Sequence, residues 1–380
     1  MNTRIPSFLS RPVALAAAAL ATALLATGPA QAAHGVAATA GQTDAAPSTR
    51  PLPVVASFSI LADLVKQVGG DRVAVESLVK AGGDTHVFQP GPAQVRQLSS
   101  ASLVVVNGLG FEGWMPRLIG SSGYKGPVVE AARGLQAMKA TDDHHHHGDD
   151  ADEDDHDHEG PHGHDHDHDG PHGHDHDEDG PHGHSHADHD HDEASHGHHH
   201  HHHGGLDPHA WQDALNVRHY VANIAEGLCQ AAPADCGGFR ERARAYDQKL
   251  LALDQEIHQA VDATPTDRRR VMVSHAAFGY YGRAYHITFM APVGVSTEEE
   301  PSASVVANLI RQARQQNVQA FFFENNSDPR LLKRMASELK NVTIGELYAD
   351  SLSPANGPAA DYLSMMRYNT RVITQALSKK

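Results

Sequence analysis

The sequence predicts an α/β protein with two lobes, each built on a mainly parallel sheet, joined by a long rigid helix. Short apolar strands alternate with helical segments both early and late in the chain, a pattern typical of parallel sheets covered by helices. One long, uninterrupted helical segment lies between these two regions. The chain of 380 residues is long enough for two such lobes after its low-complexity segments are set aside.

The first alternating region begins at Pro53. Its predicted strands are 53–60, 73–79, 103–108 and a short fourth strand at 127–132, and its predicted helices are 59–70 and 92–101. Pro92 opens the second of these helices at its first turn, where a missing N–H costs nothing.

Two helices are predicted in the middle of the chain, at 216–230 and 238–262. Apolar residues of the second helix recur every three or four positions, as one buried stripe requires, at Tyr246, Leu250, Leu253, Ile257 and Val261. A helix of this length spans about 36 Å, which makes it a rigid connector. The second alternating region begins at Arg270; its strands are 271–275, 287–290, 318–324 and 342–347, and its helices are 276–285, 302–317, 328–340 and 359–377.

A histidine tract interrupts the chain between Asp142 and His203. It contains 25 histidines and 21 acidic residues, with no Lys or Arg. Too little of it is apolar to form a core, so it is expected to be disordered. Imidazole and carboxylate are ligands of borderline divalent metals, and the tract therefore indicates a class of ligand. The tract contributes −21 to the net charge of −17, so the rest of the chain carries a net charge of +4. No cluster of basic residues suggests that the protein binds nucleic acid.

The amino terminus is typical of a cleavable signal peptide. Residues 13–26 are apolar, and Ala30-Gln31-Ala32 forms a small-x-small cleavage site. The alternative is a membrane anchor, but the apolar stretch is short for one. A lipid-anchored form would need a Cys near the cleavage site, and there is none. We expect export to a bacterial periplasm. Cys229 and Cys236 are the two cysteines of the chain. In the oxidising periplasm we expect a local disulfide between them, and a thiol metal site is the weaker alternative.

These features give a predicted domain organisation. It comprises a signal peptide (1–32), a disordered leader (33–50), an amino-terminal lobe (51–237) with the histidine-rich insert (142–204), a linking helix (238–262) and a carboxy-terminal lobe (263–380).

Four residues occupy the places where open α/β sheets bind ligands, beyond the carboxyl ends of strands. His86 follows the second strand, His275 follows the strand at 271–275, and Asp350 follows the strand at 342–347. His209 follows the insert and precedes a helix. Taken singly, each histidine fits a surface residue or a helix cap, Asp350 fits a turn cap, and Asp207 before Pro208 fits a turn start. Two of the four candidate ligands come from each lobe, so all four can meet only in the cleft between the lobes.

Other polar residues are assigned ordinary roles. His219, His258 and His286 lie in or beside predicted helices, and Phe111, Trp114 and Trp211 are expected in the core or cleft wall. Glu298, Glu299 and Glu300 resemble a carboxylate site, but they are expected at a solvated helix start, which the helix dipole favours.

At these residues the chain resembles a known family. The segments GGDTHVFQP, NGLGFEGW, LDPHAWQD, VSHAAFGYYGRAY and LYADSLS resemble signature segments of the metal-binding solute-binding proteins of ABC transporters, and more narrowly those of the periplasmic zinc-binding branch. The resemblance covers nearly all of 52–380. It implies two lobes, a backbone helix and a metal between the lobes, held by His86, His209, His275 and Asp350. A His-rich insert ahead of the second ligand is common in this branch.

The ligand set favours zinc. The resemblance implies that manganese members carry Glu where His275 stands and that some zinc members lack the carboxy-terminal Asp. Three imidazoles and one carboxylate suit tetrahedral zinc, whereas manganese prefers more oxygen and higher coordination. Copper binds such ligands more tightly by intrinsic affinity and stays an alternative.

The predicted function is capture of Zn(II), as a transported ligand, by a monomer that delivers it to an inner-membrane ABC permease for import. The rival classes are a periplasmic zinc store or chaperone without a transporter, and a manganese-binding member of the same family. An enzyme is not expected, because Asp350 fills the coordination position that hydrolysis would need open. The insert of 62 residues, with an end-to-end distance of about 40–45 Å, is expected to collect zinc weakly near His209; the alternative is a solvated spacer.

Overall fold

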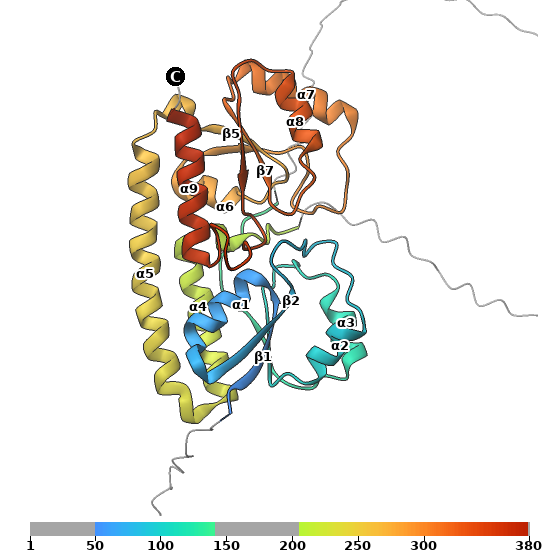
Figure 1. The fold of residues 1–380 in the computed structure, drawn as a ribbon, viewed down its shortest axis with the longest axis vertical. Helices are drawn as coiled ribbons and strands as arrows, with labels where there is room; N and C mark the ends of the chain where they lie inside the picture. The colour runs from blue at the N-terminus through green and yellow to red at the C-terminus, as the bar shows by residue number, and fades with distance from the viewer. Residues whose placement is uncertain (1–49, 141–204, 379–380) are drawn as a thin grey trace, which may run out of the picture. The chain divides into compact units, whose positions relative to one another are not determined.

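The computed structural model describes residues 50–140 and 205–378, and the expected signal peptide, nearly all of the leader and the histidine-rich insert lie outside them. Two four-stranded sheets form the framework, one in each lobe (Figure 1). Their strand orders are β2-β1-β3-β4 and β6-β5-β7-β8, and every pairing is parallel. The predicted fold class is therefore confirmed, and the two sheets share one topology.

The first lobe contains β1 (Leu52–Phe58), α1 (Ser59–Gly69), β2 (Val73–Val79), α2 (Pro92–Ser99), β3 (Leu103–Val106), α3 (Met115–Ser122) and β4 (Val128–Glu130). All four residues of β3 are buried, as a central strand covered on both faces requires. Helix α3 is absent from the sequence prediction. It has only eight residues, too few to display a periodic stripe, and Gly120 with two serines weakens its helical propensity.

The second lobe contains β5 (Arg270–Val273), α6 (Gly279–Tyr285), β6 (Thr288–Met290), α7 (Ala303–Gln315), β7 (Ala320–Glu324), α8 (Arg330–Ser337) and β8 (Thr343–Leu347). Glu298, Glu299 and Glu300 are exposed, as expected, and they lie just ahead of α7, which begins at Ala303 after Pro301 and with Ser302 as its N-cap. The Ser302 hydroxyl accepts the Val305 N–H, so this side chain satisfies the helix terminus.

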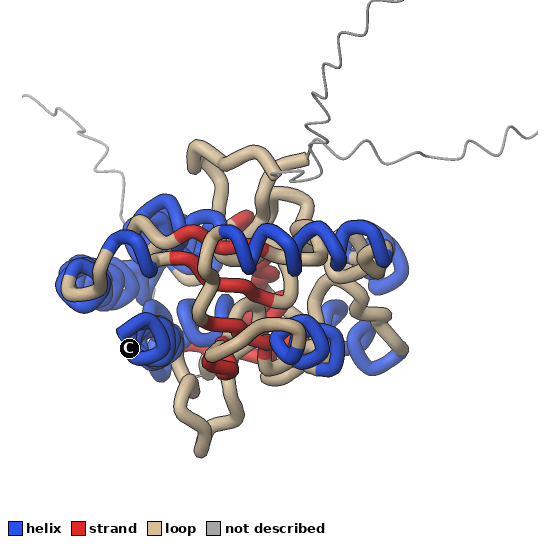
Figure 2. The backbone as a smooth tube through the Cα atoms, turned by 90° about the horizontal axis from the view of Figure 1, so that it is seen from above, coloured by secondary structure: helices blue, strands red, loops and turns tan. Residues whose placement is uncertain are grey.

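Three long helices support both lobes: α4 (Ala214–Ala231), α5 (Cys236–Asp262) and α9 (Tyr362–Ser378). Helix α5 runs alongside α4 and α9 (Figure 1) and also packs on α1. The predicted stripe of α5 is buried, with Phe239 and Ala243 extending it. Viewed from above, the strands lie between layers of helices (Figure 2). Within the described ranges, no helix is both long and apolar enough to cross a membrane.

A disulfide joins α4 to α5. Cys229, near the end of α4, is bonded to Cys236, the first residue of α5, which confirms the predicted pairing. The backbone on either side of the histidine-rich insert is also paired. Ala140 N–H donates to the Gly205 carbonyl at 2.8 Å, and Asp207 N–H donates to the Met138 carbonyl at 2.9 Å. The chain therefore leaves for the insert and rejoins at one place, close before His209.

Candidate metal centre

The structure brings the four predicted residues together between the two sheets. His86, His209, His275 and Asp350 each present one ligand atom, and these atoms all lie within 4.8 Å of one another. His275 Nε2 lies 3.2 Å from Asp350 Oδ2 and 3.3 Å from His209 Nε2. His86 Nε2 lies 3.4 Å from Asp350 Oδ2, and His209 Nε2 lies 3.6 Å from Asp350 Oδ1.

His86 is placed by the loop that follows β2. Asp84 Oδ1 accepts the His86 N–H at 2.9 Å, which fixes the turn on which the imidazole sits. The indole N–H of Trp114 donates to the Thr85 carbonyl at 2.8 Å. The Phe111 ring packs edge-on against the His86 ring, with centroids 4.8 Å apart. These contacts leave the His86 side chain only 5% exposed.

His209 lies immediately before a short 3-10 helix, η2 (Ala210–Gln212). Asp207 Oδ1 accepts the His209 N–H at 2.9 Å and also lies 2.8 Å from His209 Nδ1. Asp207 therefore does form the turn that the sequence indicates, and the same oxygen orients the imidazole. Asn107 donates to the Pro208 carbonyl at 2.9 Å, which anchors this turn to the end of β3.

His275 follows β5, and its carboxylate partner is Glu324, the last residue of β7. Glu324 Oε1 accepts the His275 N–H at 3.1 Å, while Oε2 lies 2.5 Å from Nδ1. Glu324 is buried, with 1% of its surface exposed. Because Glu324 engages Nδ1, Nε2 of His275 is left to face the cluster.

Asp350 follows β8 and is completely buried. The preceding carbonyl, that of Ala349, accepts hydrogen bonds from Trp211 Nε1 and Gln212 Nε2, both at 2.9 Å. The Tyr362 hydroxyl in turn donates to the Trp211 carbonyl at 2.7 Å. Residues beside His209 thus hold the backbone beside Asp350, so the two halves of the cluster are positioned together.

The electrostatics of the cluster are strongly coupled. Burial opposes a charge on His275, but the carboxylates of Glu324 and Asp350 outweigh it and hold the pKa of His275 well above its usual value. Burial likewise favours a neutral Asp350, but His275 and His209 hold the pKa of Asp350 well below its usual value. Without a metal, a proton on His275 therefore balances the buried carboxylates.

The arrangement has the dimensions of a tetrahedral metal site. Ligands about 2.0–2.1 Å from a tetrahedral zinc ion lie about 3.3 Å from one another. Four separations among the donor groups, counting either oxygen of Asp350, run from 3.2 to 3.6 Å, and all four ligand atoms lie within 4.8 Å of one another. Among the described residues, His86 Nε2 and both Asp350 oxygens are buried and have no hydrogen-bond partner. Buried polar atoms without partners are costly, and a cation at the centre would satisfy all three.

Sequence reasoning missed the residues that support the ligands. Glu324 is an acidic residue at the end of the otherwise apolar strand AFFFE, which is an unusual place for a carboxylate. The sequence does not indicate that its partner is His275. Asn107 and Gln212 carried no comparable signal, because their roles depend on contacts between distant segments. Phe111, Trp114 and Trp211 are buried near the cluster, as expected.

Comparison with known proteins identifies the family. Residues 54–376 match the model of the family described as zinc-uptake complex component A, periplasmic (ZnuA). The chain is 26% identical over 328 residues to the metal ABC transporter substrate-binding lipoprotein ScbA of Streptococcus cristatus, a match that covers 86% of this chain and 89% of that protein. It is 25% identical over 349 residues to the manganese ABC transporter substrate-binding lipoprotein PsaA of Streptococcus pneumoniae, covering 91% and 95% of the two chains.

The fold is also shared with a solved structure, the periplasmic zinc binding protein TroA from Treponema pallidum. The TM-score is 0.67 at 23% sequence identity, and the match covers 87% of this chain and all of the other. The family match covers most of the chain and includes both lobes and all four cluster residues. This chain therefore belongs to the ZnuA family, and it is a metal-binding, substrate-binding protein of the ABC transporter type rather than an enzyme.

Proposed function

We propose that this protein captures Zn(II) in the periplasm with His86, His209, His275 and Asp350 and delivers it to an ABC permease for import. The observation that carries the proposal is the convergence of three imidazole nitrogens and one carboxylate within 4.8 Å, with four of their separations close to the edge of a zinc tetrahedron. The burial of the cluster supports tight binding, because four fixed ligands replace the water around the ion.

Zinc is proposed over manganese because of the donor types. Three neutral imidazoles and one carboxylate suit zinc, whereas manganese prefers more oxygen ligands. Manganese stays the second candidate because several relatives, among them PsaA of Streptococcus pneumoniae, are named for manganese. Competition between the two ions for metal-free protein separates the candidates. We expect zinc to bind at least about 100-fold more tightly, and equal or tighter binding of manganese would overturn the assignment.

The site itself is tested by substitution. Zinc added to metal-free protein should raise the melting temperature, because the ion binds only the folded state. His86→Ala and His275→Ala should each abolish this shift. His219→Ala is the matched control, since His219 is exposed on α4 and lies outside the cluster. A shift that survives both cluster substitutions would move the binding site elsewhere.

Delivery distinguishes transport from storage. The two-lobed architecture favours transport, because a store needs no cleft that opens and closes. Zinc-limited cells that lack the protein should regain zinc uptake with the wild-type chain but not with His275→Ala, and only when the permease is present. If the chain restores zinc uptake or growth of zinc-limited cells even without the permease, the result would favour a periplasmic store or chaperone. The proposed working unit is a monomer, and the histidine-rich insert is proposed to collect zinc weakly for the tight site.

A further inference from the structure

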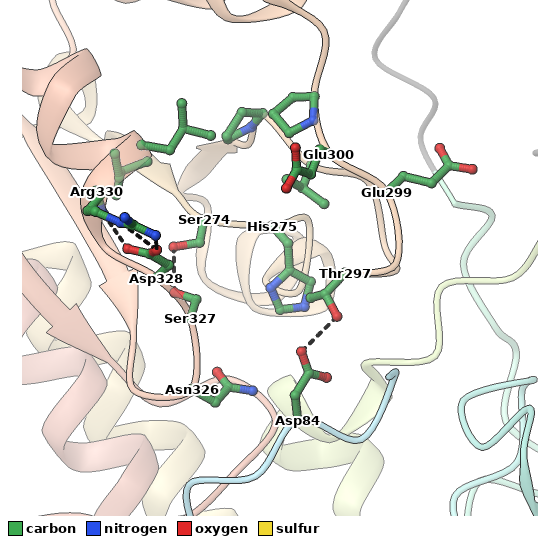
Figure 3. Close-up of a pocket in the computed structure, with 15 residues that line it drawn as sticks. Asp84, Ser274, His275, Thr297, Glu299, Glu300, Asn326, Ser327, Asp328 and Arg330 are labelled. Atoms are coloured by element: carbon green, nitrogen blue, oxygen red, sulfur yellow. Dashed lines mark hydrogen bonds and ion pairs between the residues drawn. The ribbon is translucent and has the colours of Figure 1, made fainter. Parts of the chain in front are cut away.

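The cluster is closed in this structure. The side chain of His86 is 5% exposed, that of His275 is 2% exposed, and those of His209 and Asp350 are fully buried. An ion therefore exchanges only when part of the wall moves. His275 is the cluster residue that lines a pocket of about 500 Å³, and the other three do not line it (Figure 3). The His275 ring thus lies between the cluster and this pocket, which makes the pocket side of His275 one way by which an ion could leave.

A hydrogen bond between the lobes lies at this side of the site. The Thr297 hydroxyl, in the loop between β6 and α7, donates to Asp84 Oδ2 at 2.8 Å. Figure 3 shows this bond next to the His275 ring, and both residues line the same pocket. The other oxygen of Asp84 accepts the His86 N–H. One half-buried carboxylate therefore holds a cluster residue of the first lobe and a loop of the second lobe at once.

We propose that the Asp84–Thr297 hydrogen bond is a latch that keeps the cleft closed beside His275 and so sets the rate at which the ion exchanges. Asp84 and Thr297 are positioning residues, since neither belongs to the group of four donor atoms. The inference rests on the proposed function, because it concerns an ion held by that group.

A second contact between the lobes holds the His86 loop independently of Thr297. In that loop, which follows β2, the Gly82 N–H donates to Ser351 Oγ at 2.6 Å, directly beside Asp350. This contact does not depend on Thr297. Loss of the latch therefore frees the Thr297 loop while the backbone of the His86 loop stays fixed to the second lobe, and the four donor atoms keep their places.

The pocket also suits the passage of a cation. Among the described residues, its lining includes the carboxylates of Asp84, Glu299, Glu300 and Asp328, and its basic side chains are Arg330 and the cluster residue His275. Arg330 is paired with Asp328. The carboxylates of Asp84 and Glu300 add negative charge to the pocket, which attracts a divalent ion toward His275.

The test removes the hydroxyl of Thr297 and leaves its shape. Thr297→Val should release bound zinc about tenfold faster than wild type when a fluorescent chelator is mixed in by stopped flow, as loss of one hydrogen bond to a charged group predicts. Thr297→Ser keeps the hydroxyl and should release zinc at the wild-type rate. Ser296→Ala, in the same loop, controls for a general loosening. Melting temperatures of the metal-free variants report on folding.

The outcomes separate the latch from the site. Release from Thr297→Val within twofold of wild type overturns the latch, as does equally fast release from Thr297→Ser, because the hydroxyl would then have no part in it. Failure of the wild-type protein to bind zinc at the four residues overturns the proposed function and the latch together. Fast release from Thr297→Val alone, with slow release from both other variants, supports it.

Discussion

At the scale of single residues, the geometry of the cluster depends on two carboxylates that lie behind it. Asp207 engages Nδ1 of His209, and Glu324 engages Nδ1 of His275, so both imidazoles turn Nε2 toward Asp350. A carboxylate on the far nitrogen fixes the tautomer and makes the near nitrogen a better ligand. These two imidazoles are thus already oriented for binding before the ion arrives.

Glu324→Gln should weaken zinc binding about 10- to 100-fold, the usual cost of losing such an outer partner. The amide can accept from one N–H of His275 but not from both, so the ring loses part of its orientation. Competition with a chelator of known affinity at pH 8 measures the effect. Glu241→Gln, exposed on α5, is the matched control. An affinity within threefold of wild type would show that Glu324 has no part in orienting His275.

Zinc binding should release a proton. The pKa of metal-free His275 is held well above its usual value, so this ring is protonated near neutral pH, and zinc needs it neutral. Asp350 is already ionised, because its pKa is lowered, and it contributes no proton. Affinity should therefore fall about tenfold for each pH unit below the pKa of His275.

Calorimetry at pH 7 in buffers of different ionisation enthalpy measures this proton directly. About one proton per zinc ion should enter the buffer from His275. A binding enthalpy that is the same in every buffer would mean that His275 is already neutral, contrary to the electrostatics of the cluster.

At the scale of secondary-structure elements, α4 and α5 act as one support. The Arg242 guanidinium of α5 donates to the Val68 and Gly69 carbonyls at the end of α1, at 2.7 and 3.0 Å. Bonds to the last carbonyls of a helix satisfy groups that have no partner within it. The disulfide closes the turn between α4 and α5, so it should stabilise this support and leave the cluster unchanged.

Replacing both Cys229 and Cys236 with Ala should lower the melting temperature by about 5 °C. Closing so short a loop is worth about 2–3 kcal/mol, and each kcal/mol shifts the melting temperature of a large domain by about 2 °C. Zinc affinity should not change, because the disulfide lies at the junction of α4 and α5, whereas the cluster residues lie in loops after strands or just before η2. Thermal unfolding and zinc titration of the same preparation test both statements, and a loss of zinc affinity would contradict the separation of support from site.

The sequence predicts elements with long apolar patterns better than short ones. Strand 73–79 and the buried stripe of α5 were predicted closely because each buries a regular pattern. Helix α3 was missed, because a helix of eight residues that contains Gly and Ser shows no periodic apolar pattern. The positions of the four candidate ligands followed from strand ends, but Glu324 did not, since its pairing with His275 joins strands whose register the sequence does not reveal.

At the scale of the whole described structure, two lobes of the same topology place strand ends opposite each other. His275, Glu324 and Asp350 follow or end three parallel strands of one sheet, and parallel strands bring their carboxyl ends to one edge. His86 lies in the loop that follows β2, at the corresponding edge of the other sheet. Residues that meet here are far apart in the sequence, as Ser59 and Ser351 are at a separation of 292 positions, so no local pattern could have predicted how closely the lobes approach.

The pairing of Met138 and Ala140 with residues 205–207 makes the histidine-rich insert removable as a unit. Deletion of residues 144–203 leaves Thr141, Asp142, Asp143 and Gly204 to connect the paired segments, which is enough for a four-residue hairpin loop. Equilibrium dialysis should find one tight zinc site per chain with unchanged affinity, and several weak sites should disappear. A variant with a Gly/Ser segment of equal length in place of 144–203 should behave like the deletion, because the histidines and carboxylates bind the weak ions. Loss of the tight site from both variants would place ligands within the insert, whereas weak binding that survives in both would mean that the insert does not collect zinc.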